Sequence, residues 1–393
     1  MKKKVFSLFM AVAMVVGVLA GCGSSGSPST ASSNGSSSGK NAIKIGGIGP
    51  ISGSNAVYGL ATRNGAQVAV DEINKKGGLQ FQLNFQDDEG DPEKGVNAYH
   101  KLKDWGMQIL YGCTTSDSCA TVASETYADR CFQLTPSASS TTVTEGKDNV
   151  FQLCFTDPGQ GTAAARYIGK NRLGKKVAVI YNNSDPYSTG ICNAFVTEAD
   201  KQSFKIVSTT TFPDDSTTDF SVQLNDAKKA GADLIFMPIY YTPASLILSQ
   251  AKSMGYQPSF FGCDGMDGIL SMEGFDASLA EGLMLMTPFN ASASDSATEQ
   301  FVSAYKKSYK ETPNQFAADG YDCIYVLYNA CKKAEVTAGM STPDVCKKLI
   351  KTFTADDFTF SGLTGSNMTW SVRGSVSKNP VAVRIENGKY VVM

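Results

Sequence analysis

A single histidine, His100, occurs among the 393 residues of the chain. Zinc sites and Ser-His-Asp catalysis both draw on histidine, so this scarcity argues against either chemistry. No histidine lies near a candidate serine, and no G-x-S-x-G elbow stands at an expected strand-to-helix turn. His100 itself lies in an amphipathic stretch after Asp91-Pro92, and we expect it on the surface of a helix.

Positive and negative charges are also nearly balanced in the sequence. The 35 lysines and arginines nearly balance the 37 aspartates and glutamates, and the formal net charge is −2. No polybasic stripe is present, which argues against nucleic acid as a partner. The one long apolar run, Val5 to Ala20, is shorter than the ~20 residues that a spanning helix needs. We therefore expect no transmembrane helix after this run.

The first forty residues are typical of an export signal and a tether. Lys2 to Lys4 precede the apolar run, which ends in Leu19-Ala20-Gly21-Cys22. This ending resembles the lipobox of bacterial lipoproteins and implies a signal peptide over residues 1–21, with a lipid on Cys22. The alternative is a plain signal peptide with an incidental cysteine. Residues 22–40, rich in serine and glycine, would form a flexible tether to the membrane.

No C-x-x-C pair occurs among the cysteines after Cys22. Ten cysteines in total leave an odd number in that part, so at least one is a free thiol or bonds another molecule. Cys119 with Cys131, or Cys323 with Cys331, could form a bridge. Cys113, Cys154 and Cys263 lie near expected strands, and we expect them to be buried as small apolar side chains.

Short apolar runs alternate with longer helical patterns along residues 41–393. Repeated strand–helix–strand units predict parallel sheets with helices on both faces, the doubly wound α/β class. The alternation of strand and helix patterns begins again after Asp157. A chain of this length is also longer than a single hydrophobic core usually supports. We therefore expect two lobes, 41–157 with 288–365 and 158–287 with 366–393. A hinge of several crossings, near Asp157, Thr287 and Gly365, would let the lobes close over a ligand.

Ligands of open α/β sheets bind at the carboxyl ends of the strands, where this chain has polar turns. In the first half these turns are 49–53, 112–116 and 135–140. In the second half they are 185–187, 240–241 and 263–265. Hydroxyls and helix N-termini suit a carboxylate, and an acidic side chain suits an ammonium group. We therefore expect a ligand site at these turns.

Segments in a consistent order carry a family resemblance. They are Ile45 to Gly53, Asn64 to Asn74, Asp87 to Pro92, Gly255-Tyr256 and Gly262 to Gly265. Together they resemble the periplasmic-binding-protein type I family, in its branched-chain amino acid ABC-transporter group of leucine-binding-protein-like receptors. The resemblance runs from Ile43 to Val392.

The resemblance implies a set of ligand-binding residues. Ser116, Ser137 and Ser139, with Ala138 in the same turn, match the positions that hold the carboxylate. Asp264 matches the acidic position that holds the ammonium. The turn from Gly112 to Ser124 is longer than in leucine-type receptors, so either Thr115 or Ser116 meets the ligand. The second-lobe aromatic residues that close over the ligand would be Tyr187 and either Tyr240 or Tyr241, and Tyr58 matches an aromatic residue in the first turn.

Two motifs receive other interpretations. Asp87, Asp88, Glu89 and Asp91 form an acidic cluster, but Asp91 suits a helix N-cap and we expect the others to be solvated, with no metal. Gly47-Ile48-Gly49 lacks the spacing of a dinucleotide loop, and Pro50 removes an N–H that a pyrophosphate would need. We expect no cofactor.

The sequence therefore predicts an extracytoplasmic, monomeric substrate-binding protein and not an enzyme. It would be anchored by a lipid at Cys22, bind an amino acid between its lobes and pass it to ABC permease subunits. Ser137 and Ser139 are more polar than the residues usual at these positions, which argues against a purely aliphatic preference. The alternatives are a ligand-sensing receptor of the same fold without a transport role, and an exported hydrolase.

Overall fold

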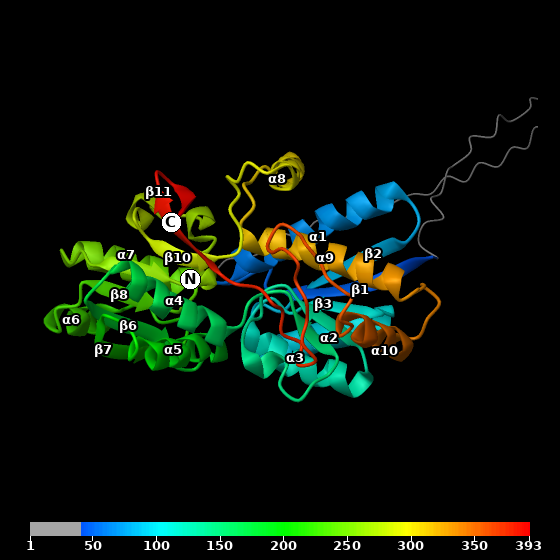
Figure 1. Cartoon of the computed structure of the whole chain (residues 1–393), viewed down its shortest axis with the longest axis horizontal. Coiled ribbons are helices and arrows are strands. Elements are labelled where there is room, and N and C mark those ends of the chain that lie inside the picture. Colours follow the sequence, from blue (N-terminus) through cyan, green and yellow to red (C-terminus); the bar gives the residue numbers. More distant parts are fainter. Residues whose placement is uncertain (1–40) are drawn as a thin grey trace, which may run out of the picture. The chain divides into compact units, whose positions relative to one another are not determined.

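The computed structural model describes residues 41–393, which form two α/β lobes (Figure 1). The predicted signal peptide, the lipidation site Cys22 and the tether lie outside the described residues. Within residues 41–393, no helix combines the length and the apolar character needed to cross a bilayer.

The first lobe is built on five parallel strands in the order β2-β1-β3-β4-β5. Hydrophobic strands buried on both faces need helices on each side, and α1, α2 and α3 supply part of this cover. Helix α9, from much later in the chain, packs along α1, and Gly65 allows this because a Cβ there would lie 1.9 Å from the Ala317 carbonyl oxygen. The elements are β1 (Ala42–Gly49), α1 (Ala56–Lys76), β2 (Gln80–Asp87), α2 (Pro92–Trp105), β3 (Ile109–Gly112), α3 (Ser116–Asp129), β4 (Phe132–Thr135), β5 (Val150–Gln152), α8 (Ser296–Tyr309), α9 (Gln315–Lys333) and α10 (Thr342–Phe353).

The second lobe has seven strands in the order β12-β11-β10-β9-β8-β6-β7. Its first five strands along the chain are parallel, and the hairpin β11–β12 adds an antiparallel edge through Asn387-Gly388. Both turn residues have positive φ, as the predicted two-residue turn requires. The elements are α4 (Asp157–Asn171), β6 (Lys176–Asn182), α5 (Pro186–Ala199), β7 (Lys205–Phe212), α6 (Ser221–Lys229), β8 (Leu234–Met237), α7 (Tyr241–Ser253), β9 (Ser259–Gly262), β10 (Met284–Thr287), β11 (Val381–Glu386) and β12 (Lys389–Val392).

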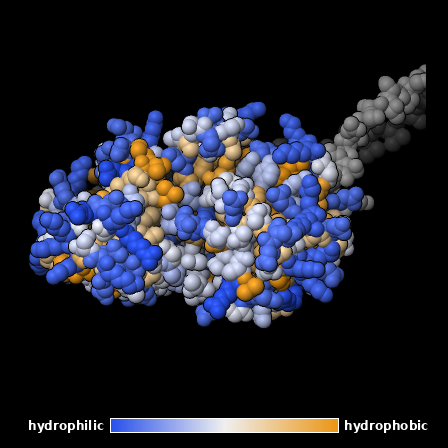
Figure 2. Space-filling view, viewed as in Figure 1, coloured by the Kyte–Doolittle hydropathy of each residue, from blue (hydrophilic) through white to orange (hydrophobic). Residues whose placement is uncertain are grey.

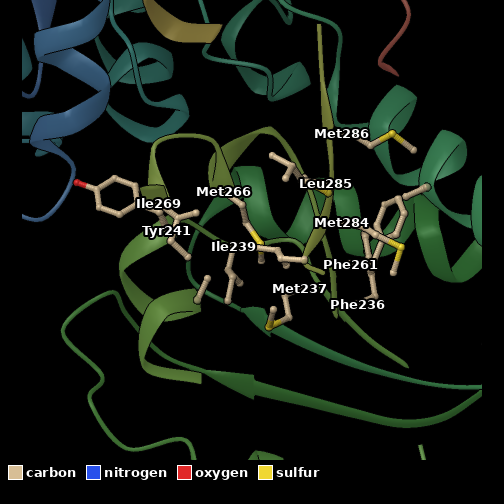
Figure 3. Close-up of a cluster of buried hydrophobic side chains, with 14 of the residues drawn as sticks. Phe236, Met237, Ile239, Tyr241, Phe261, Met266, Ile269, Met284, Leu285 and Met286 are labelled. Atoms are coloured by element: carbon tan, nitrogen blue, oxygen red, sulfur yellow. The ribbon is translucent and has the colours of Figure 1, made fainter. Parts of the chain in front are cut away.

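The core of the second lobe is rich in methionine and phenylalanine. Met237, Met266 and Met284 lie among Phe236 and Phe261, where their unbranched side chains fill the space between the strands (Figure 3). Tyr241 stands at the edge of this cluster. The core therefore reaches the loops at the carboxyl ends of the strands.

The sequence prediction of the two-lobed, doubly wound fold is confirmed, but one predicted boundary is wrong. Met368, Trp370 and Val376 pack in the core of the first lobe, although residues 366–393 were expected in the second. Trp370 also donates its indole N–H to the Gln152 carbonyl oxygen at 2.8 Å. The third crossing therefore lies between Val376 and β11, not at Gly365.

The acidic cluster before α2 is partly buried, in contrast to the expectation. Asp91 does cap α2 by accepting a hydrogen bond from the Lys94 amide. Asp88, however, is fully buried and accepts hydrogen bonds from the Ser118 hydroxyl at 2.7 Å and the Gly90 amide at 3.0 Å. The interpretation of Asp88 as solvated is wrong, because the start of α3 covers it.

The nine cysteines between residues 41 and 393 are all free and buried, so neither suggested bridge is formed. They pack as small apolar side chains, as expected for Cys113, Cys154 and Cys263. His100 lies on α2 with an exposed side chain, as expected. On the face shown in Figure 2, hydrophilic residues predominate and hydrophobic residues form separate groups.

Candidate binding cleft

The polar loops at the strand ends of both lobes meet around one cavity with an empty volume of about 240 Å³. Of the six turns expected from the sequence, three from the second lobe and two from the first contribute to this cavity. Its lining residues are Tyr58, Thr114, Thr115, Ser116, Ser137, Tyr187, Tyr240, Asp264, Gly265 and Phe316.

The wall from the first lobe is made of hydroxyl groups at the start of a helix. Thr115 is the N-cap residue of α3, and Ser116 is its first helical residue. The Thr115 hydroxyl is buried and has no hydrogen-bond partner among residues 41–393, whereas the Ser116 hydroxyl accepts the Ser140 amide at 3.2 Å. The Ser137 hydroxyl donates to the Thr114 carbonyl oxygen at 2.6 Å. The unpaired amides and the dipole of α3 favour negative charge on this side.

The wall from the second lobe is aromatic and ends in a carboxylate. The rings of Tyr187 and Tyr240 stack at 4.9 Å with an angle of 11° between their planes. Tyr187 is held at the start of α5, where the capping residue Asp185 accepts its backbone amide. The stack forms a flat surface beside Asp264.

Asp264 is the acidic group of the cavity and is 4 % exposed. Its Oδ1 accepts hydrogen bonds from the Tyr187 hydroxyl at 2.8 Å and the Gln160 amide at 2.9 Å. Burial raises the pKa of Asp264 to about 6, and these two hydrogen bonds oppose the rise. The carboxyl is therefore mainly ionised at neutral pH in an apolar setting, where a cation would interact strongly with it.

Tyr58 closes the cavity from the first lobe. Its ring packs against Phe316 at 4.4 Å, and its hydroxyl hydrogen-bonds the Gly265 carbonyl oxygen of the second lobe. The Tyr241 hydroxyl makes a second connection between the lobes, to the Ser54 carbonyl oxygen at 2.6 Å. In Figure 3 this hydroxyl points away from the second-lobe core toward the neighbouring first-lobe segment.

Three predicted residues do not line the cavity. Ala138 is buried behind the wall, where its carbonyl oxygen accepts the Gln152 amide at 2.8 Å. The carbonyl oxygen of Ser139 accepts the Asp157 amide at 3.0 Å, at the start of α4, and its hydroxyl is buried without a partner among the described residues. Tyr241 turns its hydroxyl to Ser54 instead. The other seven predicted residues come together at the cavity.

Three lining residues were absent from the prediction. Thr114 and Gly265 adjoin predicted residues in the same turns. Gly265 has its own signal, because a Cβ there would lie 2.6 Å from the Tyr187 hydroxyl oxygen. Phe316 comes from the start of α9, far along the chain, and no local pattern connects it with the cleft.

A more open hollow, of about 1050 Å³, lies elsewhere among Lys44, Lys103 and Thr342. It adjoins the beginning of β1, at the amino ends of the first-lobe strands, and Lys103 is already paired with Asp129 at 2.6 Å. Ligand sites of open α/β sheets lie at the opposite ends of the strands. The smaller cavity is thus the better candidate.

Residues 42–389 match the periplasmic binding protein family. The chain belongs to this family. Its members are solute-binding proteins and not enzymes, and the two-lobed fold with one cavity between the lobes agrees with that class.

Relatives of the chain within the family occur in several bacteria. It is 30 % identical over 299 residues to the Leu/Ile/Val-binding protein BraC3 of Rhizobium johnstonii, covering 74 % of this chain and 79 % of the relative. The structure of the branched-chain amino acid transporter substrate-binding protein LivJ of Streptococcus pneumoniae, in complex with isoleucine, is similar with a TM-score of 0.79 at 28 % identity, covering 89 % of this chain and 97 % of that one. The leucine-binding protein LivK of Thermotoga maritima gives 0.78 at 26 % identity, with the same two coverages of 89 % and 97 %.

Proposed function

We propose that the protein captures a branched-chain or similar small amino acid between its lobes and delivers it to an ABC importer. The observation that carries this proposal is the polarity of the cavity, with hydroxyls and a helix N-terminus on one lobe and the Asp264 carboxylate on the other. The names of the similar proteins, which bind leucine, isoleucine and valine, support the choice of ligand class.

The carboxylate of the amino acid would bind at the start of α3. The Thr115 hydroxyl is the strongest donor candidate, because it is buried without a hydrogen-bond partner among residues 41–393. A buried unpaired hydroxyl is unfavourable, and a hydrogen bond to the ligand carboxylate would remove this penalty. Ser116 and Ser137 would complete this side. The Ser116 hydroxyl accepts the Ser140 amide and keeps its own proton, so it would be a second donor to the carboxylate beside Thr115.

The ammonium of the amino acid would bind Asp264, whose Oδ1 accepts the hydrogen bonds from Gln160 and Tyr187 and whose Oδ2 accepts none from residues 41–393. The two sites line the same cavity from different lobes, so only a molecule with both charges would satisfy both lobes at once. Its side chain would lie against Tyr58, Phe316 and the stacked pair Tyr187 and Tyr240. This arrangement couples binding to closure of the lobes.

The membrane anchor is part of the same proposal. A lipid on Cys22 would hold the protein at the cell surface near its permease. Radioactive palmitate should label the wild-type protein in cells and leave a Cys22→Ala variant unlabelled and released from membranes. An unlabelled wild-type protein would contradict the anchor without affecting the binding proposal.

A thermal-shift screen of the twenty amino acids tests the ligand class. A ligand that binds only the folded state increases the free energy of unfolding, by about 2.7 kcal/mol when the ligand is at a hundredfold excess over Kd. The melting temperature rises as a result. We expect leucine, isoleucine or valine to give the largest shift. Equal shifts with amino acids and with simple carboxylates that lack an amino group would contradict the proposal.

A further inference from the structure

Gln160 holds Asp264 at two points. Its side-chain amide donates from Nε2 to Asp264 Oδ1 at 2.9 Å, and its Oε1 accepts the Asp264 backbone N–H at 3.1 Å. Gln160 is fully buried on α4, close to the first crossing between the lobes. An amide that binds both the backbone and the side chain of one residue restricts the rotation of that side chain.

The two oxygens of Asp264 are consequently unlike. Oδ1 accepts from Gln160 and also from the Tyr187 hydroxyl, which itself accepts the Gly265 amide at 2.9 Å. No hydrogen bond from residues 41–393 reaches Oδ2, and Asp264 lines the cavity. The pattern divides the carboxylate into one oxygen held by the protein and one available to a ligand.

We propose that Gln160 is a positioning residue, which fixes Asp264 so that its free oxygen serves the ammonium group of the ligand. The role in the ligand complex rests on the proposed function, but the action of Gln160 on Asp264 does not. Gln160 need not touch the ligand, and it does not line the cavity.

The surroundings of Asp264 make this support necessary. Burial raises the pKa of Asp264 to about 6, and the nearby Asp319 acts in the same direction. The Lys378 ammonium forms an ion pair with Asp319 at 2.8 Å, so its charge is largely compensated there and stabilises the Asp264 carboxylate little. Hydrogen bonds from Gln160 and Tyr187 are therefore the main features that favour the ionised form. Six titratable groups lie near Asp264. They are Tyr58 on α1, Cys154 before α4, Asp157 on α4, Tyr187 on α5, Cys263 directly before Asp264 in the chain, and Asp319 on α9.

The direct test is the titration of Asp264 in ligand-free protein labelled with ¹³C at the aspartate carboxyls. The Asp264 signal is the one missing from an Asp264→Asn variant. In Gln160→Leu we expect its titration midpoint to rise by about one pH unit, because the ionised form loses a hydrogen bond. An unchanged midpoint in Gln160→Leu would overturn the proposal.

Gln315→Leu is the matched control. Gln315 is equally buried and donates to the same residue, but to the Asp264 backbone carbonyl oxygen at 2.7 Å. Its loss should destabilise the fold while leaving the Asp264 midpoint within a few tenths of a pH unit. Equal shifts in both variants would mean that Gln160 acts only through general stability, which would also overturn the proposal.

Gln160→Glu provides a second variant of nearly unchanged volume, in case the leucine variant does not fold. It places a carboxylate against Oδ1, so the two acids share a proton and the midpoint should rise further. A midpoint at the wild-type value in this variant would count against the proposal as well.

Affinity for L-leucine, measured by calorimetry from pH 5 to 8, extends the test to the ligand. Wild-type affinity should be constant at high pH and fall about tenfold per pH unit below the Asp264 midpoint. In Gln160→Leu the fall should begin about one pH unit higher. If no amino acid binds the wild-type protein, the proposed function fails, while the carboxyl titration still decides the role of Gln160.

Discussion

The hydroxyl oxygen of Tyr58 accepts a hydrogen bond from the backbone amide of Tyr241 at 3.1 Å, and the two residues belong to different lobes. Their rings also meet edge to face at 4.9 Å. Tyr58 is almost fully buried, so this polar contact is shielded from water. A single hydroxyl in the cleft therefore connects the start of α1 with the start of α7.

Removing this hydroxyl should weaken ligand binding. In Tyr58→Phe the Tyr241 amide loses its partner in the closed arrangement, which costs about 1–3 kcal/mol of binding free energy. The ring contacts with Phe316 would remain. Calorimetry with the amino acid identified by the screen measures the loss, and small-angle X-ray scattering would report a more open ligand-free protein.

Tyr256→Phe is the control for that change. The Tyr256 hydroxyl donates to the Ala232 carbonyl oxygen at 2.8 Å, within the second lobe. Its removal should leave the affinity within about twofold of wild type. Similar losses in the two variants would show that the Tyr58 contact has no special role in closure.

The Asp264 carboxylate should reduce the stability of the ligand-free protein at neutral pH. Its folded pKa, about 6, lies above the ordinary value, so the folded state binds more protons than the unfolded state between these pH values. Stability from this group is present at low pH and is lost as the pH rises through about 6. An ionised Asp264 then costs about 1–3 kcal/mol above that pH.

Asp264→Asn tests this trade between stability and function. Asparagine can still accept the hydrogen bonds from Gln160 and Tyr187, but it carries no charge. Differential scanning calorimetry of ligand-free protein should find the variant more stable than wild type at pH 7.5 and nearly equal at pH 4.5. A variant that is less stable by the same amount at both pH values would contradict the prediction.

Lys378 and Asp319 form a buried ion pair beside the third crossing, with side chains 1 % and 3 % exposed. Lys378 also donates to the Thr364 hydroxyl at 2.8 Å. Lys378→Met would leave Asp319 buried without a counter-charge and should cost about 3–5 kcal/mol of unfolding free energy. Urea unfolding measures the loss.

The double variant Asp319→Leu with Lys378→Met distinguishes the ion pair from packing. It removes both charges together, so most of the lost stability should return. A double variant as unstable as Lys378→Met alone would mean that the space around the pair, and not the uncompensated charge, determines the loss.

The buried thiols should be unreactive in the native protein. Burial raises the pKa of Cys113, Cys154, Cys263 and Cys323 well above the ordinary value, which removes the reactive thiolate. Ellman's reagent should therefore detect almost no thiol before unfolding and all nine cysteines of residues 41–393 after unfolding without reductant. A smaller number after unfolding would reveal disulfides.

The sequence predicted those features that depend on local patterns. Tyr187 and Asp264 follow recognisable strands, and strand ends of parallel sheets meet at one edge, so their approach could be expected. Phe316 could not be foreseen, because only the packing of α9 on α1 brings it to the cleft. Asp88 was misjudged for a similar reason, since its burial depends on Ser118 from another element.

The error at the third crossing has a comparable origin. Residues 360–376 form only isolated bridges, Phe360 with Met368 and Trp370 with Val376, so no periodic pattern marks them. Their place in the first lobe comes from the contact of Trp370 with Gln152 and the surrounding aromatic core. Ala138 and Ser139 lie in the expected turn, but its backbone path puts their side chains behind the wall.

Leucine and 4-methylpentanoate, which differ only in the amino group, give the most direct test when titrated by calorimetry into wild-type and Asp264→Ala protein. If Asp264 holds the ammonium, the wild type binds leucine far more tightly, and the alanine variant loses roughly 2–5 kcal/mol for leucine but little for 4-methylpentanoate. Equal losses for the two compounds, or an alanine variant that binds leucine as wild type does, would contradict the account.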